Sequence, residues 1–300
     1  EYNSEDNRVE SMRSNREEPM SEIKNTTMPQ QEQIQVRQNA EHWGHLVGLR
    51  QILYDAATRQ MLETAHLKQG DRVLDIAAGV GDQSRLAAHM VGPEGSILAT
   101  DISQDMLDVA AQLAHQDGLN NITTRAMNAE QLDLPNESYD AAISRFGLML
   151  IPHKQQALAE VYRVLKPGGK IAALVWSQPE RNPLMTLYID LVIRLLAPLE
   201  EGDPSFNLVY SLADAELFAH TLADVGFQDV RVQAIDLTFH FPSFESLTTW
   251  WGPDYDRALA SLQPEARQGV VEEVQQTVRH FEGPQGIQAP AELLLGFGTK

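Results

Sequence analysis

The stretch that decides the fold is GDRVLDIAAGVGDQSRLAAHM, residues 70–90. A turn at Gly70 leads into a short run of branched apolar residues, which is typical of a buried strand. The run ends at Asp75, the loop AAGVG follows, and helical periodicity begins at Asp82. A strand, a glycine-containing loop and a helix in this order are typical of the ligand-binding edge of an α/β sheet.

The same alternation continues along the chain. Continuous apolar strands such as IAALVW, separated by amphipathic segments, predict a parallel, doubly wound sheet covered on both faces. The expected strands span residues 72–77, 96–102, 122–128, 139–146 and 170–176, and the expected helices between them span 82–91, 103–117 and 154–165. A helix over 213–225, the strand DVRVQAIDLTF and the final strand AELLLGFG follow.

Two kinds of segment lie outside this alternation. Residues 1–40 are polar with scattered apolar positions, which predicts a disordered tail. We expect residues 41–300 to form a single domain that opens with an amphipathic helix. The segments at about 181–212 and 242–290 are long and helical in periodicity, and we expect them to be lids over the site.

Composition limits the function. The net charge of −19 on 300 residues disfavours nucleic acid and anionic lipid as partners. The absence of cysteine excludes disulfides and thiolate chemistry, and no histidine or carboxylate spacing predicts a metal site. With no apolar run of roughly 18 residues and no signal-like start, we expect a cytoplasmic protein without a membrane span. The oligomeric state stays open.

The loop after the first strand favours a cationic ligand. Asp75 ends the strand and Asp82 opens the helix, so two carboxylates would repel a pyrophosphate and attract a sulfonium. The sequence GVGDQS also lacks the third glycine of the dinucleotide fingerprint. Asp101, at the end of the next strand, can accept hydrogen bonds from ribose hydroxyls. An adenosyl sulfonium is therefore favoured over a nicotinamide dinucleotide, and a plain structural turn is the simplest alternative.

The segments VLDIAAGVGDQS, ILATDIS and NAEQLDLPNESYDAAISRFGLMLIPHKQQALAEVYRVLKPGGKIA carry a family resemblance. Over residues 70–176 the chain resembles class I S-adenosylmethionine-dependent methyltransferases, most closely the ubiquinone/menaquinone-biosynthesis group and its small-molecule relatives. The resemblance implies a seven-stranded Rossmann-like sheet with an antiparallel last strand. It also implies S-adenosylmethionine as the cofactor and S-adenosylhomocysteine as the product.

The resemblance further implies a set of cofactor-binding residues, each in a stated place. These are Asp75, Ala77, Gly79 and Gly81 around the methionine moiety, Asp101 at the ribose, Ile102 and Met106 against the adenine, Asn128, Ala129 and Glu130 at the adenine edge, and Ser144, Arg145 and Phe146 beside the methyl-donor site. Two departures stand out. Ala77 replaces the first glycine of the family loop, and LMLIPHK lacks the histidines and the acid that many relatives carry after the fourth strand.

Catalysis of methyl transfer depends mainly on alignment, and a base is needed only when the acceptor holds its proton. Of His42, His45 and His153, we expect His45 to be the base, although a lone histidine is more often a surface residue. Arg145 would either hold an anionic substrate or pair with a structural acid. Six aromatic residues are candidates for the substrate pocket, with core packing as the plain alternative: Trp43, Tyr54, Trp176, Trp250, Trp251 and Tyr255.

The predicted function is methyl transfer from S-adenosylmethionine to an oxygen, nitrogen or carbon of a small, apolar or aromatic molecule. Within the enzyme class the alternative is a quinone-ring C-methyltransferase. Outside it, the alternatives are a nicotinamide-dependent oxidoreductase and a non-catalytic protein that binds S-adenosylmethionine.

Overall fold

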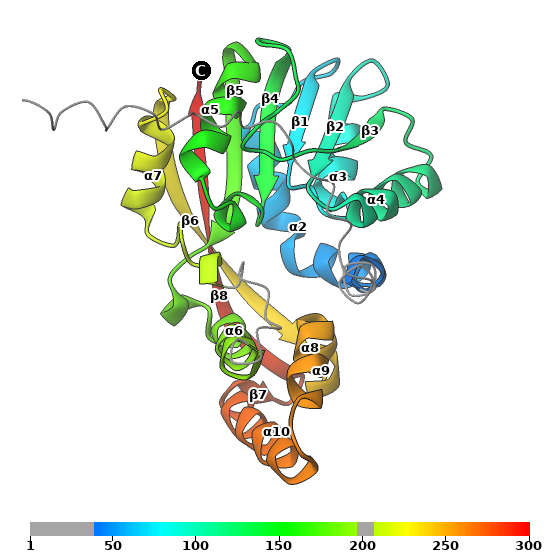
Figure 1. Ribbon diagram of the computed structural model, residues 1–300, viewed down its shortest axis with the longest axis vertical. Coiled ribbons are helices and arrows are strands. Elements are labelled where there is room, and N and C mark those ends of the chain that lie inside the picture. The colour runs from blue at the N-terminus through cyan, green and yellow to red at the C-terminus, as the bar shows by residue number, and fades with distance from the viewer. Residues whose placement is uncertain (1–38, 197–206) are drawn as a thin grey trace, which may run out of the picture.

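The computed structural model describes residues 39–196 and 207–300. Its centre is one sheet with the strand order β3-β2-β1-β4-β5-β8-β6, to whose β8 the short β7 is added (Figure 1). The strands are β1 Arg72–Ile76, β2 Ser96–Asp101, β3 Ile122–Ala126, β4 Tyr139–Arg145, β5 Leu165–Trp176, β6 Gln228–Phe241, β7 Glu282–Gly283 and β8 Gly286–Thr299.

Strand directions agree with the expected topology. The strands β1 to β5 pair in parallel, whereas β8 runs antiparallel to both β5 and β6. The order reverses at β1, which has β2 on one side and β4 on the other, and ligands bind beyond the carboxyl ends of strands at such a point. The prediction of a mostly parallel, doubly wound sheet with an antiparallel last strand is confirmed.

Helices cover both faces of this sheet. They are α2 Val47–Thr64, α3 Asp82–Val91, α4 Gln104–Gln116, α5 Lys154–Val164, α6 Pro183–Leu196, α7 Ala215–Ala223, α8 Phe244–Trp251, α9 Pro253–Ala260 and α10 Pro264–Val278, with short turns η1 Leu148–Leu150, η2 Pro179–Arg181 and η5 Arg279–Phe281. Helices α2 and α5 lie on opposite faces (Figure 1). The central strands β4 and β5 are therefore buried on both sides, which explains their continuous apolar sequences.

Strand β5 begins earlier than expected. The sequence KPGG predicts a turn before a strand at 170, but the strand already starts at Leu165, which pairs with Tyr139. The register then shifts between Tyr139 and Ala141, and Gly168 adopts a φ of 79° within the irregular segment. A glycine in a strand often marks such a bulge, so the turn residues are accommodated inside the strand.

Strands β6 and β8 extend past the rest of the sheet as a two-stranded ribbon, around which α6, α8, α9 and α10 gather (Figure 1). We call these four helices the cap. They come from the two segments predicted as lids, and that role stays a prediction. The expected tail lies outside the described residues except for its last two positions, which are helical, with Ala40 buried.

Candidate active site

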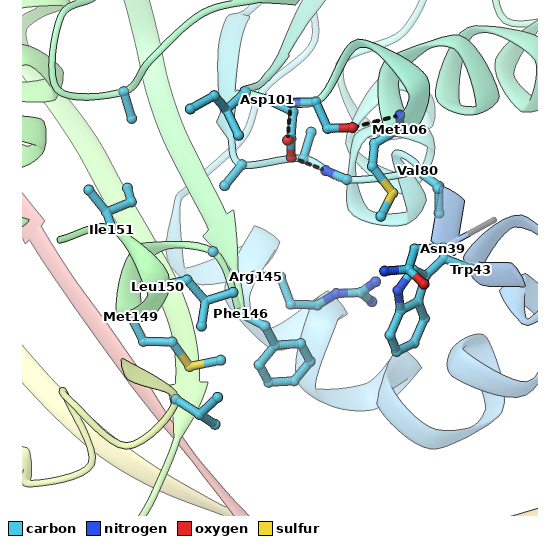
Figure 2. Close-up of a pocket in the computed structure, with 18 of the residues that line it drawn as sticks. Asn39, Trp43, Val80, Asp101, Met106, Arg145, Phe146, Met149, Leu150 and Ile151 are labelled. Atoms are coloured by element: carbon cyan, nitrogen blue, oxygen red, sulfur yellow. Dashed lines mark hydrogen bonds between the residues drawn. The ribbon is translucent and has the colours of Figure 1, made fainter. Parts of the chain in front are cut away.

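A cavity of about 800 Å³ opens at the carboxyl ends of β1, β2 and β4, between the sheet and the cap (Figure 2). Its volume lies within the range of roughly 300–1,000 Å³ that is usual for small-molecule sites. The wall is built by the helix over residues 39–45, by α2, by the loops after β1 to β4, and by α6 and α8 of the cap. The cavity thus occupies the point where the strand order reverses.

The loop after β1 is shaped for close approach of a ligand. Gly79 and Gly81 adopt φ angles of 57° and 78°, in the left-handed region that favours glycine. A Cβ atom added to Gly79 would meet no atom within 4 Å, whereas one added to Gly81 would lie 3.0 Å from the Cβ atom of Ala110. Gly79 therefore lies beside open space in the cavity wall, and Gly81 allows α4 to pack closely against the loop.

Asp101 ties this loop to the end of β2. Its Oδ2 accepts a hydrogen bond from the backbone N–H of Gly79, and its Oδ1 accepts one from that of Ser103, both at 2.9 Å. Burial raises the pKa of Asp101, and these backbone hydrogen bonds partly offset the increase. The carboxylate lines the cavity and keeps lone pairs free of these two bonds, as a ribose diol requires.

An apolar surface lies next to Asp101. The side chain of Ile102 is 80% exposed, and Met106 and Met127 line the same part of the cavity. A planar base bound beside the ribose would cover this surface, so the residues present fit an adenosine group. Asn128, Ala129 and Glu130 also line the cavity, and Glu130 accepts a hydrogen bond from the backbone N–H of His153 at 3.0 Å.

Asp75 does not line the cavity, so the expectation that its carboxylate faces a ligand is wrong. The carboxylate is fully buried and accepts hydrogen bonds from the Ser84 hydroxyl and, at 3.0 Å, from the Gln83 amide. Burial raises the pKa of Asp75 to about 7. The polar first turn of α3 folds over the end of β1, and Asp75 acts as a structural link between the two elements.

Two other predicted cofactor residues also lie behind the wall. Gly81 and Ser144 are absent from the cavity lining in the described chain. The Ser144 hydroxyl donates to the carbonyl of Ile76 at 3.0 Å and accepts a bond from the backbone N–H of Leu148 at 3.1 Å. Ser144 therefore joins the ends of β1 and β4 to the following turn, and does not face a ligand.

Asp82 lines the cavity but is neutralised by arginine. Its Oδ2 lies 2.8 Å from Nη2 of Arg50 on α2 and 2.8 Å from Nη2 of Arg145 at the end of β4. Burial on its own would raise the pKa of Asp82, but the charges of Arg50 and Arg145 outweigh it and lower the pKa. The two carboxylates expected to repel a pyrophosphate therefore present no net negative charge to the cavity.

Arg50 is a cavity residue that was not predicted from the sequence. A signal existed, because Arg50 lies on the same helical face as Leu46 and Leu53, and a charge on a buried face needs a partner. Arg145, for which two roles were left open, pairs with the structural acid Asp82 and also lines the cavity.

The other end of the cavity is aromatic. We call it the aromatic chamber and define it by the cavity-lining residues Tyr54, Phe146, Trp176, Tyr188, Trp250 and Trp251. Phe146 stacks on Trp176 with ring centroids 5.1 Å apart, and Tyr54 meets Phe146 edge-on at 4.9 Å. Four predicted substrate residues thus come together from α2, β5 and α8: Tyr54, Trp176, Trp250 and Trp251.

Two further aromatic candidates lie elsewhere. Trp43 lines the cavity from the helix over residues 39–45, and the guanidinium of Arg50 lies 5.2 Å from its ring centroid. Tyr255 is not part of the wall, because it packs behind Trp251 with ring centroids 5.3 Å apart.

His45 is not placed to act as a base. Its side chain is exposed and does not line the cavity. His42 packs against Gly252 at the junction of α8 and α9, also outside the wall, and burial lowers its pKa. His153 does line the cavity in the described structure, beside Glu130 at the adenosine end. The helical periodicity around His45 placed it on a helix but did not say which way its side chain faces.

The chain is similar to known proteins in three comparisons, with a family model, with curated sequences and with solved structures. Residues 49–239 match the model of the ubiE/COQ5 methyltransferase family. The chain is 34% identical over 184 residues to a curated relative from Marinomonas sp. (strain MWYL1), the ubiquinone/menaquinone biosynthesis C-methyltransferase UbiE. That match covers 58% of this chain and 73% of the relative.

The UbiE protein of Neisseria meningitidis serogroup C is 37% identical over 177 residues, covering 56% of this chain and 71% of the relative. Among solved structures, the YcgJ protein from Bacillus subtilis superposes with a TM-score of 0.57 at 22% identity, over 82% of this chain and 98% of that one. This structural likeness shows the fold.

Proposed function

The chain belongs to the ubiE/COQ5 methyltransferase family and is an S-adenosylmethionine-dependent methyltransferase, and from this premise we propose that its methyl acceptor is a small aromatic molecule bound in the aromatic chamber. The observation that carries this proposal is the continuity of the cavity, which runs from Asp101 at one end to Trp176 and Trp250 at the other. A donor and a planar acceptor would share one continuous cavity.

The proposed cofactor contacts follow the geometry of the adenosine end. Asp101 would accept hydrogen bonds from the ribose hydroxyls, and Ile102 and Met106 would pack against the adenine. Ala77 and Gly79 would lie along the methionine moiety, and Asn128, Ala129 and Glu130 would border the adenine edge. Support comes from the cavity lining and from the open space at Gly79.

S-adenosylmethionine supplies a methyl group on a cationic sulfur with a neutral leaving group. The chain's own residues would orient the two partners. Asp101 fixes the loop that holds one partner, and the rings of Phe146 and Trp176 form a rigid wall for the other. Holding two reactants in line can lower a barrier by roughly 7–11 kcal/mol, so positioning can provide much of the catalysis.

A quinone-like ring is a second candidate acceptor. The curated relatives from Marinomonas and Neisseria are named as C-methyltransferases of ubiquinone and menaquinone biosynthesis. The flat faces of Phe146, Trp176 and Trp250 suit such a ring. The net charge of −19 supports a small molecule over nucleic acid as the acceptor.

A direct assay tests the proposal. Purified protein is incubated with S-adenosylmethionine and a panel of phenols, catechols, hydroquinones, aliphatic amines and aliphatic alcohols, and S-adenosylhomocysteine release is measured. We expect release only with aromatic members, together with a methylated acceptor. Turnover of aliphatic members alone would contradict the aromatic acceptor. Binding of S-adenosylhomocysteine without turnover of any member would support a binding protein.

A further inference from the structure

Two buried arginines in the cavity wall share a single carboxylate. Arg50 from α2 and Arg145 from β4 both pair with Asp82 at 2.8 Å, and their side chains are only 11% and 7% exposed. All three side chains line the cavity. We call Arg50 and Arg145 the arginine pair. The arginine pair therefore brings two positive charges to one carboxylate.

The arginine pair also has unused hydrogen-bonding capacity. Arg145 donates to Asp82 at 2.8 Å and to the Thr58 hydroxyl at 3.0 Å. Arg50 pairs with Asp82 through Nη2, but its Nε atom is buried and has no hydrogen-bond partner among the described residues. A buried guanidinium donor without an acceptor costs free energy, and an oxygen-bearing anion in the cavity would remove that cost.

The positive charge lies against the aromatic chamber. The guanidinium carbon of Arg145 is 5.8 Å from the ring centroid of Tyr54 and 5.9 Å from that of Phe146. Figure 2 shows Arg145 extending from β4 across the cavity toward Trp43, with Phe146 next to it. A flat molecule seated against Phe146 and Tyr54 would thus have its edge close to a guanidinium.

We infer that the arginine pair binds an anionic oxygen group, a carboxylate or a phenolate, carried on the ring of the methyl acceptor. This inference rests on the proposed function and names the acceptor class more closely. Guanidinium groups match planar oxyanions in shape and charge, and such charge-assisted hydrogen bonds are among the stronger ones in proteins. The bound anion is a recognition group, which is held in place by the pair.

The other carboxylates of the cavity have partners of their own. Asp101 accepts hydrogen bonds from the backbone of Gly79 and Ser103, Glu130 accepts one from the backbone of His153, and Asp254 pairs with Arg257. An anionic group on the acceptor would supply a further negative partner for the arginine pair. The other possible source of an anion is the donor's own carboxylate, and the experiment below separates the two.

The test is isothermal titration calorimetry on protein saturated with S-adenosylhomocysteine. The probes are 4-hydroxybenzoate and the neutral 4-hydroxybenzamide, which have nearly the same shape. We expect the wild type to bind the carboxylate at least about tenfold more tightly, as for a charge-assisted hydrogen bond. Arg50→Gln and Arg145→Gln should abolish this preference and leave the affinity for the amide within about twofold.

Two further variants distinguish a binding role from a structural one. Arg85 lies 3.7 Å from Asp82 but does not line the cavity, so Arg85→Gln should leave the preference unchanged. Asp82→Asn removes the carboxylate that competes for the arginine pair, and we expect it to tighten binding of 4-hydroxybenzoate. Arg145→Lys keeps the charge and should retain part of the preference if the fold is intact, which circular dichroism monitors.

Several results would overturn the inference. One is a wild type that binds the two probes equally or binds neither. Another is an unchanged preference in Arg50→Gln and Arg145→Gln, combined with weaker binding of S-adenosylhomocysteine but not of 5′-methylthioadenosine, which lacks the amino-acid portion. That pattern would assign the arginine pair to the donor carboxylate. Failure of the proposed function looks different, since aromatic acceptors would then give no S-adenosylhomocysteine release.

Discussion

The carboxylate of Asp101 accepts a hydrogen bond from the backbone N–H of Gly79 at 2.9 Å, so the end of β2 holds the loop that follows β1. These two residues are 22 positions apart in the chain: Asp101 ends β2, and Gly79 lies in the loop after the neighbouring strand β1. The link places the carboxylate and the open face of the loop side by side at one end of the cavity.

Replacing Asp101 should weaken cofactor binding. Asp101→Ala removes the proposed charge-assisted hydrogen bonds to the ribose, and we expect a loss of roughly 1.5–3 kcal/mol, or about 10- to 150-fold in Kd for S-adenosylhomocysteine. Calorimetric titration measures this change. Asp108→Ala, at an exposed position on α4, is the matched control and should bind as the wild type does. If Asp101→Ala and Asp108→Ala bound S-adenosylhomocysteine with equal affinity, Asp101 would not be a ribose-binding residue.

Asp75 should make the protein less stable as the pH rises. Its carboxyl ionises near 3.8 in the unfolded chain and near 7 in the folded one because of burial. Between these values the folded chain keeps a proton that the unfolded chain has lost, so the free energy of unfolding falls from about pH 4 to about pH 7, by about 4 kcal/mol.

Asp75→Asn should abolish this decrease. Relative to the wild type, its free energy of unfolding in urea should improve steadily between about pH 4 and pH 7 and then stay constant. Asp140→Asn is the control. Burial there works against ionisation, but the hydrogen bond from Lys166 lowers the pKa of Asp140, so the wild type gains stability as Asp140 ionises below about pH 4. The difference between Asp140→Asn and the wild type should therefore stay constant between about pH 4 and pH 7. If the difference in free energy of unfolding between Asp75→Asn and the wild type stayed constant between about pH 4 and pH 7, this would contradict the assignment of Asp75 as a buried carboxyl with a raised pKa.

Trp250 should matter for the acceptor and not for the donor. It lies on α8 with its ring centroid 5.4 Å from that of Phe239, and it lines the aromatic chamber. We expect Trp250→Leu to lower kcat/KM for aromatic acceptors by about two- to tenfold, since one aromatic contact contributes roughly 0.5–1.5 kcal/mol, with unchanged binding of S-adenosylhomocysteine. Tyr255→Leu, buried behind the wall, should reduce the Tm and leave kcat/KM near the wild-type value.

His45 should be dispensable. Its side chain is exposed and outside the cavity wall, so His45→Ala should retain the wild-type turnover across the pH range. The pH profile of kcat is the informative measurement, because the loss of a true general base would remove its acidic limb. A large decrease in kcat with unchanged KM in His45→Ala would contradict this prediction and indicate that His45 takes part in catalysis.

The sheet could be predicted from sequence because its pattern is local. The apolar runs of β1, β4 and β5 and the amphipathic segments between them carry the strand and helix signals directly, and helix α3 was predicted with the bounds that it has, Asp82–Val91. The cap was recognisable only as a break in the alternation. Its assembly around the ribbon of β6 and β8 depends on contacts between segments far apart in the chain.

The site was predicted in part, and the electrostatic reason for the ligand was wrong. Asp75 and Asp82 stand beside the glycine loop, as the sequence order requires, but whether a carboxylate faces a ligand depends on its partners. Ser84 and Gln83 cover Asp75, and Arg50 and Arg145 neutralise Asp82. Arg145 is 63 residues from Asp82, and no local pattern reports such a pairing. The family assignment comes from sequence similarity.

The most direct test of methyl transfer within this cavity is mass spectrometry of a reaction with S-adenosylmethionine that carries a deuterated methyl group. With a phenolic or hydroquinone acceptor, we predict one deuterated methyl group on the acceptor for each S-adenosylhomocysteine released. The Asp101→Ala variant should give the same product at a lower rate. Release of S-adenosylhomocysteine with no label on any aromatic acceptor would contradict methyl transfer to an aromatic molecule.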